Sequence, residues 1–169
     1  MPLAVTHILI PLVLADIYRD HFAKKKFNLH YVVIAGIAGL LPDIDVAVFW
    51  IVNLFKDVGL NEIHRTFTHS LIFPLIFLFL AFLVSNYEFK RLKLRYVFFA
   101  IAFGALTHIL LDGILSGTLM PFYPFSLEPF GLNLIGNKLS GTFFTGLDAI
   151  LLVIWLIHEE INHKISDYI

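Results

Sequence analysis

Two histidines, an arginine and three hydroxyl side chains lie within seven residues, in the run HRTFTHS at residues 64–70. An apolar run follows at residues 71–84, broken only by Pro74. Polar groups at the start of a hydrophobic helix are costly to bury unless something binds them. Imidazole nitrogens are common ligands of zinc and similar divalent ions. We therefore expect His64 and His69 to bind a metal ion together with ligands from elsewhere in the chain.

His64 and His69 are five residues apart, a spacing that would splay them on one continuous helix. A helix cap at Thr66 or Thr68 would leave His64 in the preceding loop, free to turn back toward the site. Arg65 is then a candidate for holding a phosphate through two parallel hydrogen bonds. The alternative for Arg65 is a charge at the level of the lipid headgroups.

His108 and Asp112 are the second pair that could bind a metal. They are four residues apart on a strongly helical stretch, so they share one face of the helix. An imidazole and a carboxylate on one face can bind zinc or a similar ion. The alternative is a hydrogen-bonded pair that joins two helices.

Asp43 and Asp45 form a third pair, directly after Pro42. An extended backbone there would point both carboxylates to one side. Two like charges in a low dielectric repel each other unless a cation lies between them, and a divalent metal is the simplest such cation. The alternative is that Asp43 or Asp45 caps a second helical segment.

The remaining polar residues of the apolar stretches give weaker signals. His7 is a further metal candidate, and its case depends on where the membrane topology places it. Asp148 and Lys138 are weaker candidates still. The other histidines are expected in solvated loops or tails; these are His21, His30, His158 and His163.

The composition predicts a membrane protein. Hydrophobic residues make up 59% of the 169 residues, against about 45–50% in soluble domains. The net charge of −1 indicates no basic face for nucleic acid. The absence of cysteine excludes thiolate zinc sites, iron–sulfur clusters and a cysteine nucleophile. The common metalloprotease, serine-hydrolase and nucleotide-binding motifs are also absent.

We predict an all-α polytopic membrane protein with a single membrane-embedded helical domain over residues 1–169. About five apolar stretches are long enough, or nearly so, to be embedded in a bilayer. The second is expected to break near Pro42, because proline disfavours helical geometry in the residue before it. The five stretches are residues 2–18, 31–55, 66–85, 96–115 and 142–157.

The distribution of positive charge predicts the topology. Residues 19–28 and 88–95 carry four Lys or Arg each, whereas residues 56–65 carry two and residues 116–141 carry one. The positive-inside rule then places the first and third loops in the cytoplasm. His7, His64, His69, His108 and Asp112 would all lie toward the outer face. Asp43 and Asp45 join them only if the second helix ends near Leu41.

The order of these motifs resembles the YdjM-type family of membrane-bound, metal-dependent hydrolases of bacteria and archaea. The matching motifs, within residues 1–125, are His7, LPDID at residues 41–45, HRTFTHS at 64–70 and His108-x-x-x-Asp112. Their order is also similar to that of the zinc-dependent phospholipase C and single-strand nuclease superfamily. The resemblance implies a divalent metal, with zinc the expected ion, held by His7, Asp43, Asp45, His64, His69, His108 and Asp112. A second HxxxE-type ligand pair is missing, and His158-Glu159 does not provide it.

These observations lead us to expect a multi-pass protein of a prokaryotic cell membrane that hydrolyses a phosphoester. One or two metal ions would activate water, and the substrate would be an amphiphilic, lipid or lipid-linked phosphate. Asp43 or Asp45 would serve as general base, if not a ligand, and Arg65 would steady the phosphate. The alternatives are a metal or proton transporter and a structural protein whose metal joins helices. A transporter needs polar groups in the inner half, where the last three predicted helices carry almost none.

Overall fold

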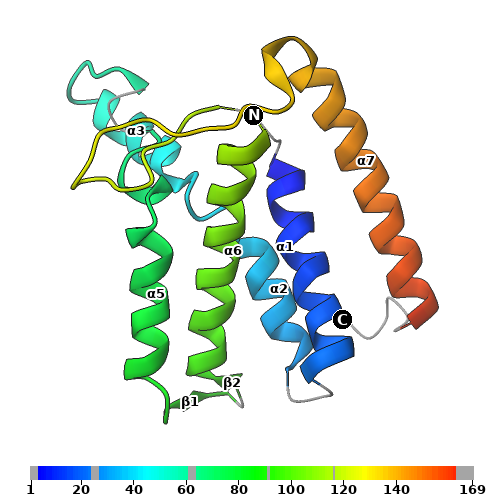
Figure 1. Ribbon diagram of the computed structural model, residues 1–169. Coiled ribbons are helices and arrows are strands. Elements are labelled where there is room, and N and C mark those ends of the chain that lie inside the picture. The colour runs from blue at the N-terminus through cyan, green and yellow to red at the C-terminus, as the bar shows by residue number, and fades with distance from the viewer. Residues whose placement is uncertain (1–3, 24–26, 61–63, 91, 116, 163–169) are drawn as a thin grey trace.

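The computed structural model describes residues 4–23, 27–60, 64–90, 92–115 and 117–162, and of residues 136–141 it describes the backbone only. Helices α1, α2, α5, α6 and α7 lie side by side as an elongated bundle, and the shorter α3 lies across one end (Figure 1). The helices are α1 (Ala4–Tyr18), α2 (Leu29–Ala38), α3 (Ile44–Asn53), α5 (Ile72–Leu83), α6 (Leu94–Leu115) and α7 (Gly136–Asn162). The chain also forms two short helical turns, a π-helical turn η1 (Arg19–Ala23) and a 3₁₀ turn η2 (Phe67–His69). Two short antiparallel strands, β1 (Glu88–Phe89) and β2 (Leu92–Lys93), form a small sheet.

The second predicted helix is broken, as the sequence indicated. Helix α2 ends at Ala38, and α3 begins at Ile44 after a turn that contains Pro42. Asp43 precedes the first turn of α3, but its side chain makes no capping hydrogen bond. The alternative role of Asp43 as a helix cap is therefore wrong, and its carboxylate is available for other contacts.

The prediction of five membrane-embedded helices is confirmed only in part. Among the described residues, two helical segments are long and apolar enough to cross a bilayer, Leu94–Leu115 and Thr142–Ile161. The segments Leu29–Ala38, Ile44–Asn53 and Ile72–Leu83 are apolar but shorter. At a rise of about 1.5 Å per residue, the ten residues of α3 extend about 15 Å, half the hydrocarbon thickness of a bilayer.

The predicted cap of the third helix is also wrong. Thr66 makes no side-chain capping bond, and the chain forms the turn η2 and an extended residue, Ser70, before α5 begins at Ile72. The hydroxyl of Ser70 donates to the carbonyl of Phe67 and closes this turn. Helix α5 therefore starts several residues later than the sequence suggested, and His69 lies in the turn.

Small residues bring α1, α2 and α6 into close contact. Ala35, Ala38, Ala100 and Ala105 are almost completely buried along these helices. Gly39 follows α2 where α1 passes so closely that a Cβ at this position would collide with the carbonyl oxygen of His7. The close approach fixes the height of α1 relative to the end of α2, as expected for membrane helices that pack through small residues.

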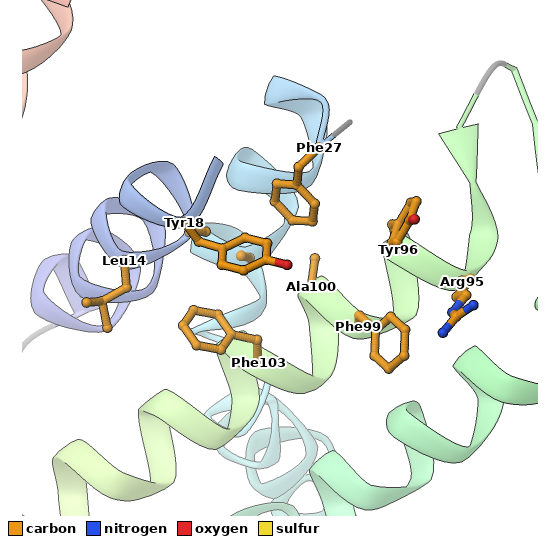
Figure 2. A pocket seen from close by; sticks show the side chains of 10 residues that line it. Leu14, Tyr18, Phe27, Arg95, Tyr96, Phe99, Ala100 and Phe103 are labelled. Carbon is orange, nitrogen blue, oxygen red and sulfur yellow. The ribbon is translucent and has the colours of Figure 1, made fainter. Parts of the chain in front are cut away.

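The two ends of the bundle differ. The β1–β2 turn and the connection from α1 to α2 lie at one end, whereas α3 and the loop between α6 and α7 lie at the other (Figure 1). A groove of about 650 Å³ lies between α1, α2 and α6 at the β1–β2 end, and its lining is largely aromatic (Figure 2). Helix α7 packs along α1 and exposes most of its apolar side chains.

Candidate metal centre

Four donor atoms from three segments face one another at the α3 end of the bundle. The Nε2 atoms of His69 and His108 are 3.2 Å apart. Asp43 Oδ1 lies 3.6 Å from each of these nitrogens. Asp112 Oδ2 lies 3.9 Å from each of them. Two imidazole nitrogens and two carboxylate oxygens at these separations are a donor set suited to zinc or a related divalent ion.

The opposite nitrogen of each imidazole is held by the protein. His108 Nδ1 donates to the carbonyl oxygen of Gly39 at 2.6 Å. His69 Nδ1 lies 3.2 Å from Asp45 Oδ2 and 3.1 Å from the Thr68 hydroxyl. A carbonyl and a carboxylate accept but do not donate, so both Nδ1 atoms carry protons. In the neutral rings the two Nε2 lone pairs then point toward each other, and a cation between them removes the repulsion.

Asp45 supports the site from behind His69. Its Oδ1 accepts from His64 Nδ1 at 2.9 Å, and its Oδ2 accepts from the Thr68 hydroxyl at 2.8 Å and from the backbone N–H of Arg65 at 3.1 Å. Burial raises the pKa of Asp45, but the hydrogen bonds from His64, His69 and Thr68 outweigh it and hold this pKa well below its ordinary value. Asp45 is therefore ionised, and its hydrogen bonds hold the histidine-rich turn at residues 64–69 in place.

The pKa of His69 is shifted upward, in the direction opposite to that of Asp45. Burial lowers the pKa of His69, but its hydrogen bonds to Asp43 and Asp45 outweigh burial, and its pKa is raised. A buried imidazole that is surrounded by carboxylates attracts positive charge, as a proton or as a metal ion.

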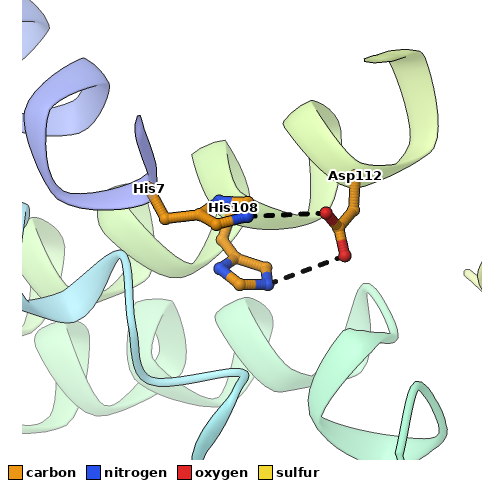
Figure 3. Close-up of side chains that lie close together, drawn as sticks. All are labelled: His7, His108 and Asp112. Carbon is orange, nitrogen blue, oxygen red and sulfur yellow. Dashed lines mark ion pairs between the residues drawn. The ribbon is translucent and has the colours of Figure 1, made fainter. Parts of the chain in front are cut away.

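His7 joins the same centre from α1. Its ring stacks on the ring of His108 with the centroids 3.8 Å apart, and its Nε2 lies 3.5 Å from Asp112 Oδ1. Figure 3 shows His7 and His108 both directed at the carboxylate of Asp112. In the described residues, four groups of donors could hold an ion, and three of them are connected: the group of Asp43, His69 and His108 shares His108 with one group and His69 with another. The structure thus brings together all seven residues for which the sequence predicted a metal-binding role.

Arg65 connects this centre to the loop that follows α6. Its Nη2 lies 3.2 Å from Asp112 Oδ2, and its Nη1 donates to the carbonyl oxygen of Thr118 at 3.2 Å. Gly117 has a φ of +111°, and a Cβ there would collide with the guanidinium. Arg65 itself has a φ of +64°, in the left-handed region that is uncommon for residues other than glycine. The guanidinium is therefore positioned by the backbone conformation of Arg65 itself and by the backbone at residues 117 and 118.

Asp43 is the most solvent-exposed of the four facing donors. His69, His108 and Asp112 are at most 1% exposed. The side chain of Asp43, in contrast, is 32% exposed. Asp43 therefore lies at the opening of the site, and the other ligands form its floor.

Apolar side chains are exposed on α3, on the turn after it and on the loop between α6 and α7, at the same end of the bundle as the centre (Figure 1). Trp50, Leu54 and Phe55 of α3 and the turn after it are exposed, and so are Phe122 and Phe125 of the loop between α6 and α7. This loop is attached to the site through Thr118 and through the carbonyl of Pro121, which accepts from the N–H of Leu71. We call these five exposed residues the rim surface. Its aromatic side chains are of the kind enriched at membrane–water interfaces.

The sequence indicated Thr68 only as a possible helix cap and Asp148 only as a weaker candidate, but both side chains make polar contacts. Thr68 links Asp45 to His69, and the Thr6 hydroxyl bonds Asp148, which is 7% exposed. Asp148 thus bonds Thr6 of α1, the residue before His7, rather than the donor set. The side chain of Lys138 lies outside the described residues.

Buried ionisable groups also lie near the β1–β2 end, where the sequence indicated almost none. Asp16 is 1% exposed and lies 3.3 Å from His158 Nε2 and 3.2 Å from Arg19 Nη2. Glu159 is equally buried. His158 is 36% exposed, as expected for a partly solvated side chain, but α7 continues beyond residue 157 and also brings it against Asp16 of α1. His163 lies outside the described residues.

The chain was compared with known protein families, curated proteins and solved structures. A family model described as YdjM inner membrane protein matches residues 1–165. Neither the curated proteins nor the solved structures contain a match.

Proposed function

The chain belongs to the YdjM inner membrane protein family, and on this premise we propose that it is a membrane-embedded, metal-dependent hydrolase of phosphoesters. The proposed substrate is a lipid or a lipid-linked phosphate. The proposed ion is a divalent metal such as zinc, held by the four facing donors, with His7 and His64 available for a second ion. Such an ion would supply Lewis-acid activation of water and stabilisation of the charge that develops on the phosphate.

One observation supports the proposal above the others. The two Nε2 atoms of His69 and His108 face each other at 3.2 Å, while both Nδ1 atoms are committed as donors. A shared proton would relieve the repulsion between the two lone pairs. The two flanking carboxylates, Asp43 and Asp112, favour a higher positive charge at this point than one proton supplies.

The residues take different roles in this proposal. Asp45 positions His69 and His64, because both of its oxygens already accept hydrogen bonds from the protein. Asp43 is the better candidate for a ligand that also accepts a proton, because its carboxylate is partly exposed at the opening. Arg65 lies against Asp112 of the donor set and, with Nη1 and Nη2 engaged, offers its charge to a phosphate rather than a free pair of donors.

The rim surface supports an amphiphilic substrate. Phe55 and Phe125 are each 87% exposed on elements at the end of the bundle that holds the donor set (Figure 1). A phosphate headgroup at the donor set would leave its attached chains next to this apolar surface. A soluble phosphate ester would gain nothing from it.

Transport of a metal ion or proton is less well supported. The inner half does contain the buried pair of Asp16 and His158, which a relay could use. Between His7 and Asp16, however, the buried residues of α1 are apolar, and they are Leu9, Pro11, Leu12 and Ala15. The described residues therefore offer no continuous polar path along this helix.

Metal analysis combined with activity tests the proposal. Purified wild type is compared with His69→Ala and Asp112→Asn, and bound metal is measured by elemental mass spectrometry. Turnover of a phosphodiester and of phospholipid vesicles is measured on the same samples. We expect stoichiometric divalent metal in the wild type, and loss of both metal and turnover in each variant.

His30→Ala is the matched control, since His30 is an exposed imidazole whose side chain bonds only Asn28 in the described part of the chain. It should retain both metal and turnover. A folded wild type without metal would overturn the metal centre. Stoichiometric metal without turnover of any phosphoester would retain the centre and overturn the hydrolase.

A further inference from the structure

The groove between α1, α2 and α6 lies far from the donor set and has a lining of its own. Leu14 and Tyr18 of α1 form one wall, and Phe99 and Phe103 of α6 form the other. Figure 2 shows the ring of Tyr18 between Phe27 and Phe103, with Ala100 behind it. Small residues at Ala15, Ala35 and Ala100 leave the volume of about 650 Å³ between the aromatic rings. A cavity of this size is within the range of small-molecule and lipid-chain sites.

Arg95 provides the charge at the groove. Its guanidinium lies 5.4 Å from the centroid of the Phe99 ring, and its side chain is exposed. In the described part of the chain, Arg95 has no carboxylate partner, whereas Lys93 lies 4.0 Å from Glu88. Arg95 is thus a cation next to an apolar cavity without an internal counter-charge.

The surroundings add positive charge. Arg95 is the second residue of α6, whose first turn contains no acidic residue, and the N-terminus of a helix carries a partial positive charge. The preceding sequence from 88 to 95 contains four Lys or Arg against one Glu. An anion is therefore the complementary ligand.

We propose that this groove binds one acyl chain of an anionic phospholipid, whose phosphate pairs with Arg95. The apolar volume accommodates the chain, and the aromatic rings pack against it. The lipid comes from the leaflet at the β1–β2 end of the bundle. Zwitterionic lipids fit the groove equally well by shape but offer less net charge to Arg95.

The proposal does not depend on the metal centre. Arg95 and His108 are thirteen residues apart on α6, which corresponds to about 20 Å along the helix. A phosphate at Arg95 is therefore out of reach of the donor set. The bound lipid is a resident ligand of the fold and not the substrate of the proposed hydrolase.

Lipid titration of the purified protein tests this inference. The full chain in neutral detergent is titrated with phosphatidylglycerol or with phosphatidylcholine of the same acyl chains, and bound lipid is counted by native mass spectrometry. We expect tighter binding of phosphatidylglycerol. Arg95→Gln should weaken it about fivefold, since one basic residue near a lipid surface contributes on the order of 1 kcal/mol.

Two further variants complete the test. Lys93→Gln removes a neighbouring charge that lies 4.0 Å from Glu88, and it should lower the affinity less than Arg95→Gln does. Leu14→Trp fills the groove from its exposed wall and should abolish binding of both lipids without altering the core. Equal affinities of Arg95→Gln and Lys93→Gln, or undiminished binding to Leu14→Trp, would overturn the proposal.

Discussion

Asp45 is the residue that orders the histidine-rich turn. It accepts hydrogen bonds from His64, Thr68 and the backbone of Arg65, and it faces Nδ1 of His69. Groups that orient a metal-binding imidazole in this way typically contribute about 10–100-fold to metal affinity. This gives Asp45 a testable role that differs from that of a ligand.

We predict that Asp45→Asn lowers metal affinity by about 10–100-fold but does not abolish binding. The amide keeps the size of the side chain while losing the charge and one acceptor. The measurement is a competition between the purified protein and a chelator of known affinity. Asp57→Asn is the control, because Asp57 is exposed. Complete loss of metal in Asp45→Asn, matching Asp112→Asn, would identify Asp45 as a ligand instead.

The depressed pKa of Asp45 also sets the direction of its pH effect. Because its pKa in the folded protein lies below the ordinary value of 3.8, its stabilisation is complete above that value. The stabilisation is lost only as the pH falls through the folded pKa. Between pH 5 and pH 8 Asp45 therefore stays ionised, and its own titration leaves the free energy of unfolding unchanged.

The residue types and spacing predicted which residues form the centre, but not which of them face the site and which orient the others. His69 and His108 could be named from their motifs. That their Nδ1 atoms bond Asp45 and the carbonyl of Gly39 depends on where backbone and side chains meet in three dimensions. No spacing rule contains a contact between residues 39 and 108.

Gly39 lies at the break between α2 and α3 and also contacts His108 of the donor set. Its carbonyl accepts from His108 Nδ1, and the absence of a side chain lets α1 approach. We predict that Gly39→Ala destabilises the protein by about 1–3 kcal/mol, because the added methyl group collides with the backbone at His7. Thermal unfolding in detergent measures the stability, and metal content of the same sample should fall.

Gly146→Ala is the matched control for this substitution. Gly146 lies within α7, and a Cβ there would meet no atom within 4 Å. The exchange should be neutral or slightly stabilising, since alanine is the better helix former by about 0.5–1 kcal/mol. Equal unfolding temperatures for the two variants would show that the close approach at Gly39 is not required.

The start or end of a helix could be predicted where one residue, such as a proline, determines it, but not where tertiary contacts determine it. Pro42 marked the break between α2 and α3 correctly. The start of α5 was missed because the Ser70 hydroxyl bonds the carbonyl of Phe67 and stabilises a separate turn. The last helix was expected to end at residue 157, but α7 continues to Asn162, with His158 against Asp16 and Glu159 buried.

At the scale of the whole molecule, the described residues of the basic segments 19–28 and 88–95 lie at one end and the donor set lies at the other (Figure 1). The positive-inside rule then predicts that the site opens outside the cell. Single cysteines at Asp57 and Lys93 test this in a chain that has none of its own. A membrane-impermeant maleimide should label position 57 on intact cells and position 93 only after lysis. The reverse pattern would place the metal centre on the cytoplasmic face.

The arrangement of the donor set has a consequence for how the protein is made. His7 leaves the ribosome about a hundred residues before Asp112, which corresponds to several seconds at ordinary rates of synthesis. Until α6 has entered the membrane, the nascent chain has neither His108 nor Asp112 to offer an ion. Under the proposed function, the complete donor set would therefore form only late in biogenesis, after insertion, on the side of the membrane where the site opens. The metal available in that compartment, rather than the one available at the ribosome, would then determine which ion the four facing donors bind.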